Sequence, residues 1–176
     1  MPITPFHFGP GLLIKSIAGR HFSWVAFVMA NILIDLEPIG YFLLTGEPIH
    51  PYLHTYMGAL ILGMLIALFG RRPCEAWTRL WNNRLCPNEL EWTRASQTFT
   101  PTALATGGLL GTLSHVAIDS IMHFDVHPWK PFLPGNSMQG LVSIEALHMW
   151  CIGVGLAGVV VLYVARCIDS KAQNKI

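Results

Sequence analysis

Four long apolar stretches limit what this chain can fold into. They cover residues 22–44, 56–69, 102–122 and 141–165. A helix needs about 20 mostly apolar residues to cross the hydrocarbon core of a bilayer, and it satisfies its own backbone there. The last two stretches have this length, the first has it if its carboxylates are tolerated, and the second is shorter. We therefore predict an all-α integral membrane bundle of about four transmembrane helices.

A fifth apolar segment, residues 8–19, precedes the first stretch and is too short to cross a bilayer alone. Such a segment is typical of a half-helix that packs into a bundle or lies at the membrane interface. Charged residues make up only 12% of the chain, whereas a soluble domain usually has about a quarter. We therefore expect residues 1–176 to form a single integral membrane domain in contact with the lipid bilayer.

The basic residues predict the orientation of this bundle. Of the eleven Lys and Arg residues, all except Lys130 lie before the first stretch, after the second or after the fourth. Because basic segments stay in the cytoplasm, we expect residues 71–100 to form an Arg-rich cytoplasmic loop and the C-terminus to be cytoplasmic as well. Residues 45–53 and the His- and Pro-rich loop 123–140 would then face outward.

The composition argues against two classes of function. The formal net charge is +1 and the chain has no run of basic residues, so nothing indicates a nucleic-acid partner. The cysteines at 74, 86, 151 and 167 form no CxxC pair, which argues against a zinc finger. We expect ordinary thiols, with those of Cys74 and Cys86 cytoplasmic and reduced.

Ionisable residues gather at the predicted outer ends of the spans. The full set is His7, Asp35, Glu37, His54, His115, Asp119, His123, Glu145 and His148. A carboxylate at the centre of a spanning helix costs roughly 2.5–3.5 kcal/mol. A bound divalent cation with histidine ligands would offset that cost, as would water in a polar cavity or pairing of the groups with one another.

Two of these residues, His115 and Asp119, are four positions apart on the third predicted helix. That spacing puts them on one face, with their Cβ atoms about 5–6 Å apart. Imidazole and carboxylate are ligands that suit zinc and similar divalent ions. The sequence continues His-Phe-Asp-Val-His, and an extended backbone there would put His123, Asp125 and His127 on one side. We therefore predict a divalent metal site at the end of this helix, with His123 among its ligands.

The remaining histidines have a weaker case as ligands. His21 is expected at the membrane interface beside Arg20 without a role, and His50 is expected to be an ordinary loop residue. His127 is more typical of a solvated loop histidine than of a ligand. His148 is equally compatible with metal binding and with a hydrogen bond to a carbonyl group or to Glu145.

Four sequence fragments carry a resemblance to a known family. In this order, "TPFH", "ILIDLEP", "HTYMGALILG" and "GTLSHVAIDSIMH" resemble the membrane-bound metal-dependent hydrolases. That family is also described as LexA-binding, inner membrane-associated hydrolases, and looks like a remote relative of zinc-dependent phospholipase C. The resemblance extends to about Pro131 and implies a bacterial inner membrane protein. The orientation predicted from the basic residues places its site on the outward-facing side. It implies the metal ligands His7, Asp35, His54, His115 and Asp119.

These features lead to the hypothesis of a membrane-embedded hydrolase with one or two divalent metal ions, Zn²⁺ being the expected ion. The metal would lower the pKa of a bound water and polarise a phosphoryl or acyl oxygen. Either Glu37 or Asp125 is the candidate general base. A site near the outer leaflet suggests a lipid ester or phosphoester as the substrate.

Three other interpretations stay open. The same groups could form a metal or proton relay of the kind found in transporters, although the inner halves of the second and fourth stretches are almost purely apolar. His54 and His115 could be axial ligands of a haem, which would not explain the aspartates. A non-enzymatic structural or partner-binding role is the third, and the sequence leaves the oligomeric state open.

Overall fold

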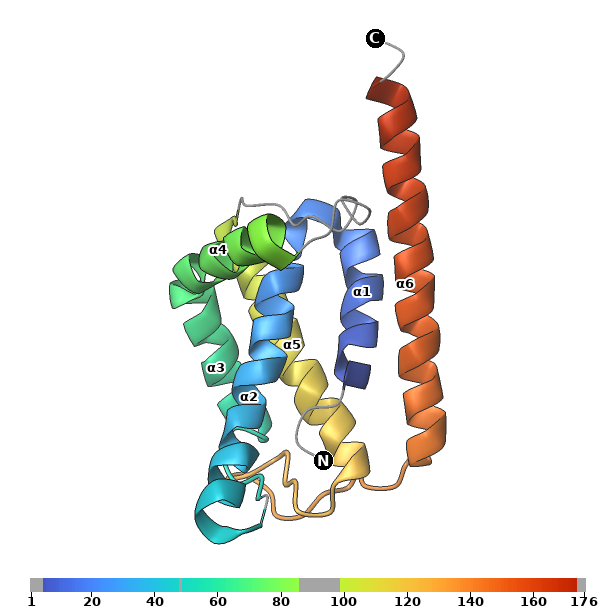
Figure 1. Ribbon diagram of the computed structural model, residues 1–176. Helices are drawn as coiled ribbons and strands as arrows, with labels where there is room; N and C mark the ends of the chain where they lie inside the picture. Colours follow the sequence, from blue (N-terminus) through green and yellow to red (C-terminus); the bar gives the residue numbers. More distant parts are fainter. Residues whose placement is uncertain (1–4, 48, 86–98, 174–176) are drawn as a thin grey trace.

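The computed structural model describes residues 5–47, 49–85 and 99–173, which form helices and connecting loops without any strand. Figure 1 shows a bundle of roughly parallel and antiparallel helices with one short helix lying across its end. The prediction of an all-α fold is therefore confirmed. The six α-helices of the described residues are α1 (Phe8–Ala18), α2 (Trp24–Thr45), α3 (Tyr56–Phe69), α4 (Arg71–Leu80), α5 (Pro101–Met122) and α6 (Ile144–Gln173).

Three helices, α2, α3 and α5, begin close to the starts of predicted apolar stretches, and a capping residue stands directly before each of these helices. Ser23 before α2, Thr55 before α3 and Thr100 before α5 each accept a hydrogen bond of 2.9–3.1 Å from the backbone N–H three residues later. Such bonds satisfy one of the unpaired amides at a helix start. At the other end of α2, Gly46 has a φ of 84°, a left-handed conformation that suits glycine and ends the helix.

Two helices are long and apolar enough to cross a membrane, namely α2 and the 144–168 part of α6. A third span is formed if α3 and the segment 71–84 are counted as one broken span, bent by 73°. Like α2, α5 has 22 residues, but half of them are buried and several of those are polar or glycine. Its position at the centre of the bundle explains why it is less apolar than a helix that faces lipid.

The predicted 71–100 loop is partly helical, which corrects that expectation. It begins with α4 and continues as a π-helical turn over Trp81–Leu85. Within α4, Cys74 and Thr78 are one turn apart and both are buried. The Arg71 side chain is exposed and paired with Glu75. This helix lies across one end of the bundle (Figure 1). The rest of the segment, residues 86–98 with Cys86 and Arg94, lies outside the described residues.

The packing of α5 against α2 and α3 depends on glycine. A Cβ atom at Gly111 would lie 2.7 Å from the Cβ of Ala30 and 2.9 Å from the carbonyl oxygen of Phe27 in α2. One at Gly108 would lie 3.0 Å from the carbonyl oxygen of Gly63 in α3. Small residues of this kind let membrane helices approach closely. The three helices are thereby brought near enough for their polar side chains to meet.

The pair α1 and α6 forms the second half of the bundle. The two helices lie side by side, and α6 extends well beyond the others (Figure 1). Gly9 and Gly158 lie directly against the backbone of the opposite helix. The exposed face of α6 is strongly apolar, as expected for lipid contact. Its exposed large residues include Met149, Trp150, Ile152, Leu156, Val160, Val161, Tyr163 and Val164.

The glycine contact between α5 and α2 generates a stability prediction. Gly111→Ala forces a methyl group against Ala30 and Phe27, so we expect it to destabilise the fold by about 1–3 kcal/mol through overpacking. Gly40→Ala is the matched control, because a Cβ atom at Gly40 has no heavy atom within 4 Å. Thermal unfolding in detergent, followed by circular dichroism, compares the two. Equal melting temperatures for both variants would contradict the close-packing role of Gly111.

Candidate metal centre

Four ionisable side chains from three segments meet in one buried group, here called the central cluster. Asp35 comes from α2, His54 from the loop before α3, and His115 and Asp119 from α5. One donor atom of each residue lies within 4.8 Å of the other three. All four residues are at most 5% exposed. The sequence-based expectation of a group that could hold a metal ion is thus confirmed for these four residues.

The spacing of the donor atoms suits a small divalent cation. Asp119 Oδ2 lies 3.2 Å from His115 Nε2 and 3.4 Å from His54 Nε2. Asp35 Oδ1 lies 3.3 Å and 3.9 Å from the same two nitrogens. In tetrahedral zinc sites with bonds of roughly 2.0–2.1 Å, neighbouring donor atoms are about 3.3 Å apart. The four side chains are therefore spaced so that they could hold one such cation.

Two atoms of the cluster have no other partner. The Nε2 atoms of His54 and His115 are buried and form no hydrogen bond within the described part of the chain. A buried polar atom left unpaired costs about 1–3 kcal/mol, so a native fold rarely leaves two of them side by side. A cation between them and the two carboxylates would satisfy both.

The second ring nitrogen of His115 shows how that ring is oriented. His115 Nδ1 lies 3.0 Å from Asn31 Oδ1, and Asn31 Nδ2 donates a 2.8 Å hydrogen bond to the carbonyl oxygen of Phe27. Because the amide nitrogen is engaged as a donor, Asn31 Oδ1 is an acceptor and His115 Nδ1 carries the proton. The neutral ring then presents a lone pair on Nε2 to the cluster, which is the arrangement of a metal-binding histidine.

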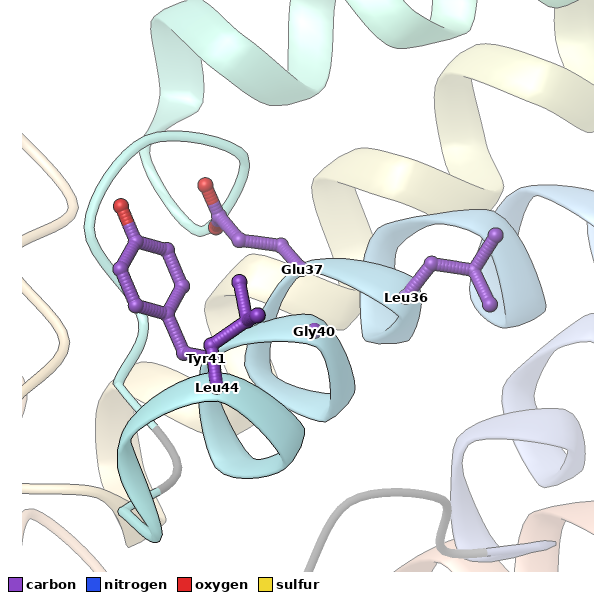
Figure 2. Close-up of a pocket in the computed structure, with 5 residues that line it drawn as sticks. All are labelled: Leu36, Glu37, Gly40, Tyr41 and Leu44. Atoms are coloured by element: carbon purple, nitrogen blue, oxygen red, sulfur yellow. The ribbon is translucent and has the colours of Figure 1, made fainter.

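Glu37 supports His54 in a similar way. Its Oε2 lies 3.4 Å from His54 Nδ1 and accepts a 2.8 Å hydrogen bond from the amide of Leu53, while Oε1 accepts one from Tyr52. Figure 2 shows Glu37 extending from α2 toward the loop that precedes α3. The carboxylate thus ties this loop to α2 and positions His54. Its predicted role as a general base stays a prediction.

His7, predicted as a ligand, lies beside the central cluster and not among its four donors. Its Nε2 is 2.9 Å from Asp119 Oδ1, the carboxylate oxygen that does not face His54 and His115. Its ring stacks on the ring of His115 with 4.2 Å between centroids. His7 therefore contacts both of these side chains, and its predicted role as a ligand stays a prediction.

A second group of donors shares Asp119 and is here called the outer group. It consists of His50, Asp119 and His123, each with one donor atom within 4.8 Å of the others. His123 was predicted as a ligand, whereas His50 was expected to be an ordinary loop residue. That expectation was wrong, because His50 is only 5% exposed and stacks on His123 with 5.0 Å between ring centroids. Its position four residues before His54 was the available signal.

The segment after His123 is a turn and not the extended stretch considered above. Phe124 and Asp125 form the turn, so His123 and Asp125 both approach His50, while His127 joins neither group of donors. Asp125 Oδ2 lies 2.7 Å from His50 Nδ1 and also accepts a hydrogen bond from the His50 amide. Asp125 therefore positions His50, and its role as a general base stays a prediction.

Two groups in this loop have shifted pKa values. Burial lowers the pKa of His123, which favours the neutral imidazole. Burial alone would raise the pKa of Asp125, but the hydrogen bond from His50 outweighs it, so the pKa lies below its ordinary value. At neutral pH both groups are in the form that supports cation binding.

The two ionisable residues at the start of α6 lie outside both groups of donors. Glu145 is exposed. The ring of His148 stacks on Phe6 with 4.1 Å between centroids, and its Nε2 is buried without a hydrogen-bond partner in the described residues. The ring of His148 thus packs on Phe6, and neither metal binding nor a hydrogen bond from Nε2 is seen among the described residues.

An open cleft of about 250 Å³ lies on α2 next to Glu37. Figure 2 shows its lining, in which Glu37 is the charged member. The first residue of this lining, Leu36, follows directly after the cluster residue Asp35. The lining residues are Leu36, Glu37, Gly40, Tyr41 and Leu44.

Comparisons of the chain with protein-family models, with curated proteins and with solved structures found no match. The function therefore has to be inferred from the geometry of these two groups of donors.

The contact between Asn31 and His115 generates a prediction for metal affinity. Asn31→Leu removes the acceptor that orients the ring, so we expect zinc affinity to fall by about 10–100-fold. Asn31→Asp keeps an acceptor and should retain wild-type affinity. Competition with a chromogenic chelator measures both in the detergent-purified protein, with Ser114→Ala as a control on the neighbouring residue. A folded Asn31→Leu protein with wild-type affinity would contradict the proposed orientation of His115.

Proposed function

We propose that this chain is a membrane-embedded, metal-dependent hydrolase with a divalent cation, Zn²⁺, in the central cluster. The observation that carries the proposal is the convergence, in a buried site, of two carboxylates and two imidazole nitrogens that form no hydrogen bond among the described residues. Two neutral histidines and two ionised aspartates together contribute two negative charges, which balance one divalent cation. Buried charges that are balanced in this way are tolerated in an apolar interior, whereas unbalanced ones are not.

A divalent cation held there supplies Lewis-acid activation of water and of an ester oxygen. The protein side chains have separate tasks around it. His54 and His115 present Nε2 lone pairs, and Glu37 and Asn31 keep those rings in the required orientation. A general base has to lie within hydrogen-bond reach of the reacting water, and we propose Glu37 or Asp125 for that task.

The surroundings of the cluster support a lipid ester or phosphoester as the substrate. Asp35 lies near the middle of α2, a helix apolar enough to cross a membrane. The cleft on α2 begins at the next residue, Leu36, and its lining gives an acyl chain an apolar surface close to the cluster. A substrate with a lipid tail could enter this cleft from the bilayer without passing through water.

We also propose membership of the membrane-bound metal-dependent hydrolases and a location in a bacterial inner membrane, with the site facing outward. Support comes from the motif residues, since all members of the central cluster belong to the fragments that carry the family resemblance. The cluster lies near the start of α3, and the Arg-rich helix α4 follows its other end, about 20 Å away along 14 residues. This separation agrees with a cytoplasmic α4 and an outward-facing site.

Two of the alternative functions fit the structure less well. Asp119 Oδ2 lies 3.4 Å and 3.2 Å from the Nε2 atoms of His54 and His115, so a carboxylate occupies the space that a haem between these rings would need. A relay would need polar groups at several depths, and α3 contains no acidic, basic or histidine residue. Both observations favour the hydrolase.

The proposal predicts metal binding and activity that depend on His115. We expect the zinc-loaded wild type to hydrolyse a fluorogenic lipid ester or phosphodiester in mixed micelles, and a chelator to abolish this activity. In His115→Ala, activity should fall at least 100-fold because the central cluster loses a ligand. His21→Ala is the matched control, as His21 is exposed and remote from both groups of donors.

Metal analysis after a chelator wash and zinc reloading gives an independent readout. The wild type and His21→Ala should bind zinc, and His115→Ala should bind at least one ion fewer per chain. Absence of bound metal in the wild type, or full metal content in a folded His115→Ala protein, would overturn the metal-dependent hydrolase.

A further inference from the structure

In the part of the chain that the structure describes, the carboxylates around the central cluster and the outer group have histidine partners but no Lys or Arg partner. Asp35, Glu37, Asp119 and Asp125 form ion pairs only with histidines among the residues that the structure describes, and no Lys or Arg lies within pairing distance of them. Their side chains are between 5% and 24% exposed. One divalent cation in the central cluster would balance only two of these four negative charges, so charge remains to be balanced near Asp125.

The outer group lies where that charge remains. His50 and His123 have stacked rings, and each has a donor atom within 4.8 Å of Asp119. The contact of His50 with Asp125 also suits ligation, because its Nδ1 donates to Asp125 Oδ2 at 2.7 Å, and in the neutral ring Nε2 is then the nitrogen with a free lone pair. A carboxylate on the far nitrogen is the common support of a metal-binding histidine, and it repeats the arrangement of Glu37 on His54.

Asp119 is placed between the two groups of donors. It belongs to both, and its two oxygens face different neighbours: Oδ2 faces the nitrogens of the central cluster, while Oδ1 contacts His7. It lies in the last turn of α5, and His123 caps that helix by donating its amide to the Asp119 carbonyl oxygen. One regular helix end thus fixes the positions of Asp119 and His123 relative to each other.

We infer that His50, His123 and Asp119 form a second divalent-cation site, and that the Asp119 carboxylate bridges it to the cation of the central cluster. This inference rests on the proposed function of the central cluster and adds a second ion to it. His50 and His123 are ligands of the second cation, and Asp125 positions His50. With two cations, the four carboxylates are fully balanced.

Metal stoichiometry of the full chain in detergent tests this second site. Each protein is stripped with a chelator, reloaded with zinc, desalted and measured by mass spectrometry of the metal. We expect two ions per chain in the wild type and in His21→Ala, and one ion in His50→Ala and in His123→Ala. Asp125→Asn should weaken the second ion by about 10–100-fold and leave the first unchanged.

The outcomes separate this inference from the proposed function. One ion in the wild type, unchanged in His50→Ala, overturns the second site and leaves the central site standing. Two ions in a folded His50→Ala protein also overturn it. No ion in the wild type overturns both proposals. Melting temperatures of the stripped variants close to that of the stripped wild type show that lost metal is not caused by unfolding.

A bridging Asp119 has its own signature. In the Co²⁺-loaded wild type, electron paramagnetic resonance should show two exchange-coupled ions, whereas His50→Ala should show the signal of one isolated ion. Two uncoupled ions in the wild type would overturn the bridge.

Discussion

This structure depends on one constraint: among the described residues, its buried acidic side chains pair with histidine and not with Lys or Arg. Asp35 and Asp119 are at most 5% exposed in a bundle of apolar helices, and the described ion pairs of both involve only histidine. An ionised carboxylate in such surroundings is costly unless it is paired or binds a metal. The close approach of α5 to α2 and α3 through glycine brings the histidines near enough to share that charge. The fold and the site are therefore stabilised by the same contacts.

The supporting residues explain why this group of side chains is more than a set of paired charges. Three histidines, at positions 50, 54 and 115, each have one ring nitrogen next to an oxygen acceptor, namely Asp125, Glu37 and Asn31. In each case the other nitrogen, Nε2, points away from that acceptor. The Nε2 atoms of His54 and His115 lie 3.2–3.9 Å from carboxylate oxygens of Asp35 and Asp119 and form no hydrogen bond in the described residues, a spacing that a shared cation would satisfy.

Much of the fold and part of the site could be predicted from the sequence. Apolar length predicts α2, α3, α5 and α6, because lipid contact and burial both require apolar residues, and helical periodicity places His115 and Asp119 on one face. The sequence does not predict which loop residues turn inward. The positions of His50 and Asp125 depend on how two loops distant in sequence pack together, and the contacts of His7 with Asp119 and His115 likewise depend on tertiary structure. The helix α4 was not predicted because its arginines indicated a solvent-exposed loop. The one-turn spacing of Cys74 and Thr78, which are both buried, was the sign of a helix there.

The depth of the central cluster limits how a substrate could reach it. Asp35 is the twelfth residue of α2, so it lies about 17 Å from the start of that helix and well inside the length of a span. His54 approaches it from a loop that Glu37 ties back onto α2. The outer group then lies between the cluster and the end of α5, where His123 ends the helix. Under the proposed function, the tail of a lipid substrate would follow the apolar cleft on α2, whose lining residue Glu37 contacts His54.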